Sequence, residues 1–92
     1  MQKKNLKNLN KNKILFLDRD GVINFDKGYL YKYEDLEYIP GIFDLCLYLT
    51  KKLKFKIIII TNQSGIGRGF YSEEKFHRLM KKIINDFKKR KI

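Results

Sequence analysis

The sequence has 92 residues, a length that allows one domain with a modest core and excludes a second domain of ordinary size. Hydrophobic residues make up 43% and aromatic residues 14%, which excludes a chain that is disordered throughout. A single cysteine, Cys46, excludes an internal disulfide. The sequence shows neither a signal-peptide core nor a membrane span, so we expect a cytoplasmic protein with no membrane partner.

The formal net charge of +11 is concentrated at the two ends of the chain. Residues 1–13 and residues 81–92 carry +5 each, which leaves +1 for the segment between them. Charged ends are typical of solvated tails, so a nucleic-acid partner is not the favoured interpretation. A noncatalytic basic domain that binds nucleic acid or a protein partner through residues 81–91 stays open as an alternative. We expect a basic tail over residues 1–12 and one domain over residues 13–92.

Two apolar runs predict short buried strands. Residues 13–17 (KILFL) end abruptly at charged residues, and residues 56–60 (KIIII) consist largely of β-branched side chains. Residues 22–39, between the first strand and the next element, show no helical period. They predict a loop or a small hairpin.

Two amphipathic stretches predict helices. The first begins at Pro40, ends near Lys54 and gathers four apolar side chains on one face, namely Ile42, Cys46, Leu49 and Leu53. The second follows Ser72, a good N-cap, and has two acidic residues in its first turn. Its predicted core positions are Phe76, Leu79, Met80, Ile83, Ile84 and Phe87. His77 falls outside this stripe and is expected to be an exposed helical residue.

The element order strand, helix, strand, helix predicts an α/β fold with the two strands parallel. Parallel strands end at the same edge of a sheet, which is where open α/β sheets bind ligands. Asp18 follows the first predicted strand and Thr61 follows the second. We therefore expect these two residues to lie close together.

The acidic pair Asp18 and Asp20 stands beside the apolar first strand. Carboxylates are costly to desolvate unless they are paired or bound to a metal. An aspartate can attack phosphorus as a nucleophile, and a second carboxylate can serve as general acid and base. Because a carboxylate needs a screening cation to approach a phosphate dianion, this chemistry favours Mg²⁺. Taken alone, a D-x-D pair is more typical of the start of a surface turn.

The second strand leads into TNQSGIGRG. Its glycines allow main-chain amides to approach anionic oxygens, and the hydroxyl of Thr61 is suited to hold a phosphoryl group. Asn62, Gln63 and Ser64 can add hydrogen-bond donors. The glycines could also only punctuate a loop, and Arg68 could be either a phosphate ligand or a solvated arginine. A purely structural interpretation leaves unexplained why both motifs end parallel strands.

The segments FLDRDGVIN, DKGY, PGI and TNQSGIGRG resemble the haloacid dehalogenase (HAD) superfamily, in its histidinol-phosphate and heptose-bisphosphate phosphatase branch. The resemblance covers residues 13–87. It implies a Rossmann-like core with a parallel sheet and a magnesium-dependent phosphomonoesterase with an aspartyl-phosphate intermediate. The substrate it favours is the 7-phosphate of D-glycero-D-manno-heptose 1,7-bisphosphate, a precursor of lipopolysaccharide. Histidinol phosphate and a polynucleotide 3′-phosphate stay open as alternative substrates.

The resemblance also implies residue roles. Asp18 is the nucleophile and a metal ligand, and Asp20 is the acid and base and offers its main-chain carbonyl to the metal. The implied substrate contacts are Asp26, Lys27, Gly28, Tyr29, Thr61, Asn62, Gln63 and Ser64.

The sequence departs from this branch after residue 87. A zinc loop of cysteine and histidine, a basic residue that neutralises phosphate and a later aspartate of the magnesium site have no counterpart in the 92 residues. We therefore expect an N-terminal half, from a truncated or split gene, with an open sheet edge and exposed apolar surface. Turnover by this chain without a C-terminal half as partner stays an open question.

Overall fold

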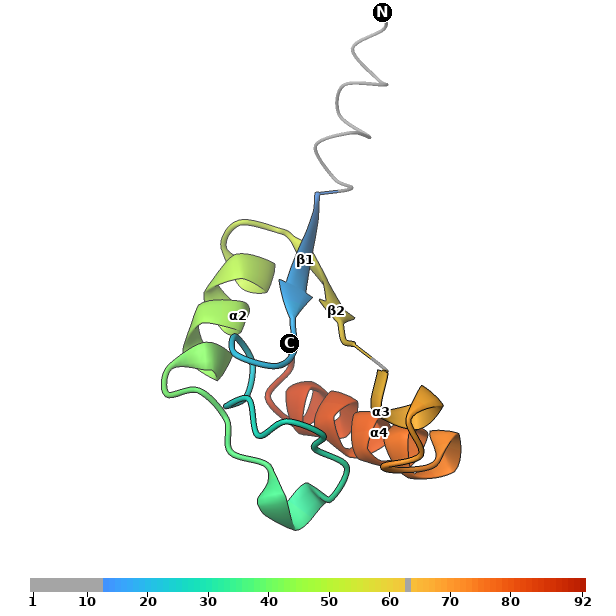
Figure 1. Ribbon diagram of the computed structural model, residues 1–92. Helices are drawn as coiled ribbons and strands as arrows, with labels where there is room; N and C mark the ends of the chain where they lie inside the picture. Colours follow the sequence, from blue (N-terminus) through green and yellow to red (C-terminus); the bar gives the residue numbers. More distant parts are fainter. Residues whose placement is uncertain (1–12, 63) are drawn as a thin grey trace, which may run out of the picture.

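The computed structural model describes residues 13–62 and 64–92 (Figure 1). The predicted basic tail, residues 1–12, lies outside the described residues. The elements in chain order are β1 (Ile14–Asp18), a 3-10 turn η1 (Tyr33–Asp35), α2 (Ile42–Lys51), β2 (Lys56–Ile60), α3 (Ser64–Gly67) and α4 (Glu73–Lys89).

The two strands form a parallel sheet, so the predicted α/β fold and strand direction are confirmed. Asp18 pairs in register with Ile60. Just beyond this pair, the main-chain N–H of Arg19 donates to the carbonyl of Ile60 at 2.8 Å. Both strands therefore end at the same edge, and the residues after them enter the same region of space (Figure 1).

Both helices largely follow the sequence pattern. In α4 the predicted N-cap is confirmed, since Ser72 Oγ accepts a hydrogen bond from the Lys75 N–H at 3.1 Å. In α2 the helix begins at Ile42, two residues later than predicted, because its N-cap is Gly41 with a φ of 83°. Leu53 lies beyond the end of that helix.

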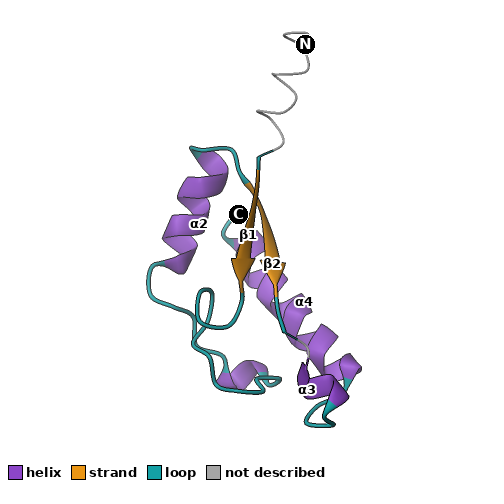
Figure 2. Cartoon of the chain, turned by 45° about the horizontal axis from the view of Figure 1, so that its top comes forward, coloured by secondary structure: helices purple, strands orange, loops and turns teal. Residues whose placement is uncertain are grey.

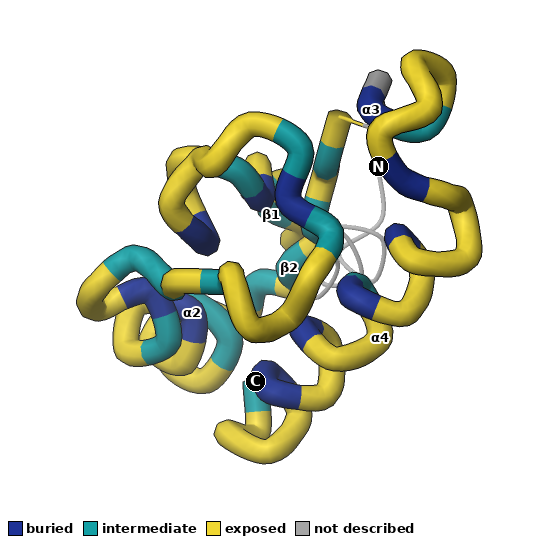
Figure 3. The backbone as a smooth tube through the Cα atoms, turned by 60° about the horizontal axis from the view of Figure 1, so that its bottom comes forward, coloured by how far each residue is buried: buried dark blue, intermediate teal, exposed yellow. Residues whose placement is uncertain are grey.

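The core lies on one face of the sheet. Its buried members are Ile23, Leu30, Ile42, Cys46, Leu79, Ile83 and Phe87. Leu17, Ile57 and Ile59 pack against this cluster from the strands. Because α2 and α4 both contribute to the cluster, both helices lie on this same face (Figure 2). Along α4, the buried positions recur on the side that faces the rest of the molecule (Figure 3).

The opposite face of the sheet is exposed, so the prediction of fully buried strands is wrong for this face. Ile14, Phe16, Ile58 and Ile60 are 42 to 59% exposed. The prediction of Ile84 as a core residue is also wrong, since it is 45% exposed. No element among the described residues covers these side chains. The expected open sheet and exposed apolar surface are therefore found.

Residues 22–39 form the predicted loop, which contains η1 and is tied to α4 by a shared carboxylate. The hydroxyls of Tyr33 and Tyr38 both donate to Asp86 Oδ2, each at 2.7 Å. Asn24, at the start of the loop, makes isolated bridges with Asp20 and Tyr38. The loop is thereby held between the end of β1 and the last helix.

None of the helices that the structure describes combines the length and the hydropathy needed to cross a lipid bilayer.

Candidate functional site

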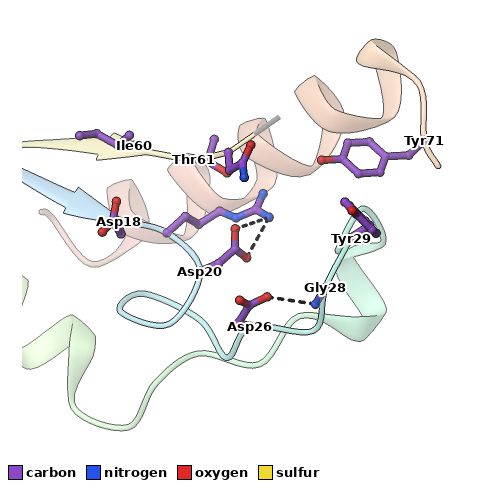
Figure 4. A pocket seen from close by; sticks show the side chains of 10 residues that line it. Asp18, Asp20, Asp26, Gly28, Tyr29, Ile60, Thr61 and Tyr71 are labelled. Atoms are coloured by element: carbon purple, nitrogen blue, oxygen red, sulfur yellow. Dashed lines mark hydrogen bonds and ion pairs between the residues drawn. The ribbon is translucent and has the colours of Figure 1, made fainter. Parts of the chain in front are cut away.

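A pocket of about 470 Å³ opens at the carboxyl ends of the two strands (Figure 4). Its lining residues are Asp18, Arg19, Asp20, Asp26, Gly28, Tyr29, Ile60, Thr61, Asn62 and Tyr71. The structure thus brings the acidic pair after β1 and the threonine after β2 into one cavity. Part of the 22–39 loop forms the opposite wall.

Asp18 is the last residue of β1, and its side chain is exposed to the pocket (Figure 4). Among the described residues, none donates a hydrogen bond to its carboxylate. Its main chain is fixed by pairing with β2. Asp18 therefore offers an accessible carboxylate on a rigid support.

Asp20, in contrast, is held by two neighbours. Arg19 Nη2 lies 3.1 Å from Oδ1 and 3.2 Å from Oδ2, and Asn24 Nδ2 donates to Oδ1 at 3.1 Å. Arg19 is only 1% exposed, and its other terminal nitrogen lies 3.5 Å from Met80 Sδ. Gly21, with a φ of 90°, lets the chain turn back directly after the acid.

The loop wall of the pocket is built around Asp26. Its Oδ1 accepts the Gly28 N–H at 3.0 Å, which closes a local turn. Gly28 itself has a positive φ of 78°, a conformation that favours glycine. Tyr29 stacks on Phe70 with ring centroids 4.3 Å apart, and its hydroxyl accepts a hydrogen bond from Arg68 at 3.0 Å. Arg68 therefore supports the wall and is not among the lining residues.

Thr61 brings a buried hydroxyl to the pocket. Its Oγ1 is buried and has no hydrogen-bond partner among the described residues. An unsatisfied buried hydroxyl costs about 1 to 3 kcal/mol, and this hydroxyl belongs to a residue that lines a pocket with carboxylates. A phosphoryl oxygen in the pocket would give it a partner.

Three predicted substrate contacts differ from the rest. Lys27 does not line the pocket, because its ammonium pairs with Glu37. Gln63 lies outside the described residues, and Ser64 begins α3. Their roles stay predictions from the resemblance.

Tyr71 and Arg19 line the pocket although no site role was predicted for them. Tyr71 is buried beside Gly65, where an added Cβ would overlap the Tyr71 ring and lie 2.8 Å from Tyr29 Cδ1. Gly65 indicates in the sequence that another group approaches the main chain closely, but the sequence does not tell that this group is the ring of Tyr71. The short helix α3 was missed for a similar reason, since glycine-rich runs predict loops.

The donor set of the pocket fits Mg²⁺. In the described part of the chain, no three side chains of His, Cys, Asp or Glu gather into a metal cluster. Mg²⁺ commonly takes only one or two protein carboxylates and completes its shell with water and phosphate oxygens. The carboxylate of Asp18 and the main-chain carbonyl of Asp20 are hard oxygen donors of the kind this ion prefers.

Comparison with characterised proteins points to one group of relatives. No model of a known protein family matches the chain. It is 51% identical over 82 residues to a D-glycero-alpha-D-manno-heptose-1,7-bisphosphate 7-phosphatase of Campylobacter jejuni, covering 89% of this chain and 47% of the relative. It is 54% identical over 71 residues to a D-glycero-beta-D-manno-heptose-1,7-bisphosphate 7-phosphatase of Helicobacter pylori, covering 77% and 40%.

Solved structures agree with this result. The D,D-heptose 1,7-bisphosphate phosphatase of B. bronchiseptica, complexed with magnesium and phosphate, matches with a TM-score of 0.75 and 26% identity over 85% of this chain and 44% of that chain. A putative HAD-like phosphatase of Mesorhizobium loti matches with a TM-score of 0.73 and 25% identity, over 88% and 38%. The chain spans less than half the length of these relatives. Over the matched part, the chain is therefore similar to heptose-1,7-bisphosphate 7-phosphatases in sequence and to HAD-like phosphatases in fold, and the partial coverage fits an N-terminal portion of such proteins.

Proposed function

We propose that the pocket is the catalytic half-site of a magnesium-dependent phosphomonoesterase that removes the 7-phosphate of D-glycero-D-manno-heptose 1,7-bisphosphate. The observation that carries this proposal is the common pocket of Asp18 and Thr61. One residue supplies an accessible carboxylate, and the other supplies a buried hydroxyl that has no hydrogen-bond partner in the part of the chain that the structure describes. The carboxylate can attack phosphorus as a nucleophile, and the hydroxyl can donate a hydrogen bond to a phosphoryl oxygen.

In the first step, an oxygen of Asp18 attacks phosphorus and the bond from phosphorus to the sugar oxygen breaks. Thr61 donates a hydrogen bond to a phosphoryl oxygen and steadies the group during transfer. Asp20, in its protonated form, gives its proton to the departing sugar oxygen, so the products are a heptose 1-phosphate and an aspartyl phosphate.

In the second step, Asp20 removes a proton from a water molecule that attacks the phosphorus of the aspartyl phosphate. The bond to Asp18 breaks, which releases phosphate and restores the Asp18 carboxylate and the protonated form of Asp20. Arg19 and Asn24 hold the Asp20 side chain in place. Bound Mg²⁺ would supply charge neutralisation between the Asp18 carboxylate and the phosphate dianion.

Several further roles belong to this proposal. Asp26, Gly28, Tyr29 and Asn62 contact the sugar phosphate from the pocket wall, and the roles of Lys27, Gln63 and Ser64 come from the resemblance. Zinc would need cysteine and histidine ligands beyond the buried Cys46 and the single histidine of this sequence. We assign it to the part of the relatives that this chain does not match. The single free cysteine is compatible with the cytoplasm, which we propose as the location.

The test is phosphate release from heptose 1,7-bisphosphate, with histidinol phosphate and a DNA 3′-phosphate as competing substrates. The chain is assayed alone and after co-expression with the unmatched C-terminal part of the Campylobacter jejuni relative. We expect release that requires Mg²⁺, favours the heptose and is abolished by Asp18→Asn. The matched control is Asp44→Asn, which makes the same change in α2 away from the pocket.

Equal activity in Asp18→Asn and Asp44→Asn, or full activity in excess chelator, would overturn the proposed mechanism. A stronger response to either competing substrate would overturn the heptose assignment and leave the chemistry intact.

A further inference from the structure

Two clefts adjoin one another on the outer side of α4. The first, of about 240 Å³, lies between the start of α4 and the loop that contains η1, and the second, of about 350 Å³, lies farther along the helix. Both are lined by Arg78 and Lys82, so together they form one groove, the α4 groove. It shares no lining residue with the catalytic pocket.

The lining of the α4 groove is strongly cationic. Its basic side chains are Lys32, Lys75, Arg78, Lys81, Lys82 and Lys88. Among the described residues that line it, Glu34 is the only acidic one, while Glu74 pairs with Arg78 at 2.8 Å. A concave surface of one charge focuses the electric field and concentrates counter-ions. The groove therefore favours an anionic ligand.

The basic side chains form a row along α4. Lys75, Arg78 and Lys82 are three and four residues apart, a spacing that places them on one face of a helix. This face is exposed, whereas the buried residues of α4 lie on the side toward the core (Figure 3). From Lys75 to Lys88 the row is about 20 Å long. Several successive phosphates of one nucleic-acid strand occupy such a length.

Two tyrosines of the loop complete the groove. The Lys75 Nζ lies 5.3 Å from the centroid of the Tyr31 ring, and the Lys82 Nζ lies 5.1 Å from that of Tyr33. Attraction between ammonium group and ring keeps charge and aromatic surface together. The Tyr33 ring is 39% exposed, and its hydroxyl is fixed by donating to Asp86 Oδ2 at 2.7 Å. The groove thus offers aromatic surface beside its cations.

This combination favours one class of anion. A cationic groove with aromatic side chains is the arrangement by which proteins bind single-stranded nucleic acid without sequence preference, because the phosphates meet the cations and the bases stack on the rings. An acidic peptide would use only the cations. A helix that lies on a lipid surface inserts its apolar side, but α4 has buried that side in the core.

We propose that the α4 groove binds single-stranded nucleic acid. The phosphates lie along Lys75, Arg78 and Lys82, and bases contact Tyr31 and Tyr33. The groove includes part of the basic segment 81–91 and extends it to the loop. This binding goes beyond the proposed phosphatase function and requires neither the catalytic pocket nor Mg²⁺.

The test is fluorescence anisotropy of a dye-labelled oligo(dT) of about 15 nucleotides with a 3′-hydroxyl end, titrated with the 92-residue chain in excess chelator. We expect saturable binding whose association constant falls steeply as salt is added, because counterions are released. A matching duplex and an abasic oligomer of equal length should each bind about tenfold more weakly, since neither offers bases for stacking.

A matched pair of double variants assigns the contact to the groove. Lys75→Gln with Lys82→Gln removes two charges from its lining, so the affinity should fall about tenfold and the slope of log affinity against log salt should become shallower by about 1.4. Lys51→Gln with Lys52→Gln removes two exposed charges at the end of α2, outside the groove. Its affinity should stay within about twofold of the unmodified chain.

Absence of binding at low salt would overturn the proposal, as would equal losses in the two double variants. Equal affinity for the abasic oligomer would overturn the assignment to nucleic acid, and tighter binding of the duplex would overturn the assignment to a single strand. Vesicles of phosphatidylglycerol that depend on Lys75 and Lys82 where oligo(dT) does not would assign the groove to a lipid surface instead. Because no outcome depends on phosphatase activity, failure here is separate from failure of the proposed function.

Discussion

The guanidinium group of Arg19 binds the carboxylate of Asp20 through one nitrogen that reaches both oxygens, at 3.1 and 3.2 Å. The arginine is nearly fully buried, whereas the Asp20 side chain is 19% exposed toward the pocket. The pair thus anchors the proposed acid and base from inside the protein. The middle residue of the D-x-D motif, Arg19, thus fixes the position of the second aspartate, Asp20.

Replacing Arg19 should be costly for the fold. Arg19→Met keeps the apolar stem but removes the partner of a partly buried carboxylate, so the free energy of unfolding should fall by about 2 to 3 kcal/mol. Urea denaturation followed by circular dichroism measures this loss. Arg78→Met removes an exposed ion pair with Glu74 on α4 and should cost less than about 0.5 kcal/mol. Equal losses would contradict the anchoring role.

Removing the hydroxyl of Thr61 should separate stability from binding. Thr61→Val deletes a buried group that has no partner in the described structure. The free energy of unfolding should therefore stay unchanged or rise by up to about 1 kcal/mol. Affinity for inorganic phosphate in the presence of Mg²⁺ should fall about tenfold, the loss of one hydrogen bond of about 1.4 kcal/mol.

The control for this variant is Thr50→Val, whose hydroxyl donates to the Cys46 carbonyl at 3.0 Å. It should lose about 0.5 to 1 kcal/mol of stability and keep its phosphate affinity. A destabilised Thr61→Val that still binds phosphate normally would show that the hydroxyl serves the fold.

Two neighbouring glycines of α3 should respond differently to the same substitution. In Gly65→Ala the new methyl group overlaps Tyr71 and Tyr29, which both line the pocket. We expect a loss of about 1 to 3 kcal/mol from overpacking and a weaker phosphate site. Gly67→Ala meets no atom within 4 Å and should stabilise the chain slightly. Thermal unfolding and phosphate titration of both variants decide this, and a harmless Gly65→Ala would contradict the packing described here.

The tyrosine pair on Asp86 predicts a loss of stability in alkali. Burial and the hydrogen bond to Asp86 raise the pKa of Tyr38, and the hydrogen bond to Asp86 raises the pKa of Tyr33. The folded chain therefore keeps these protons after an unfolded tyrosine, with a pKa near 10.0, has lost its own. The resulting stabilisation is complete below about pH 10 and declines as the pH rises further.

Tyr38→Phe should lower the free energy of unfolding by about 1 kcal/mol at neutral pH and flatten its decline between about pH 10 and 12. Urea denaturation at a series of pH values measures both effects. Tyr48→Phe, at an exposed position of α2, should change neither. An unchanged alkaline slope in Tyr38→Phe would refute the role given to this cluster.

The sequence predicted the elements whose signals are local. The isoleucine run gave β2 with its observed bounds, and Ser72 marked the start of α4, because β-branching and capping act on the nearest residues. The meeting of Asp18 and Thr61 followed from strand direction, which the element order determines.

Burial was harder to predict because it depends on distant parts of the chain. Phe16 and Ile84 have the composition of core residues, yet no described element covers them. Tyr71 enters the pocket only because Gly65 leaves room for its ring. Such pairings arise from the final packing, and no periodicity within one segment encodes them.

The proposed function requires the ends of β1 and β2 to form a single phosphate site. The most direct test is a titration of the isotope-labelled chain with Mg²⁺ and inorganic phosphate, followed by the amide NMR signals of every assigned residue. We expect the amide signals of Asp18, Asp20, Thr61 and Asn62 to shift together along one binding curve, and these shifts to vanish in Asp18→Asn. Shifts confined to the basic residues 81–91, or to only one of the two strand ends, would contradict it.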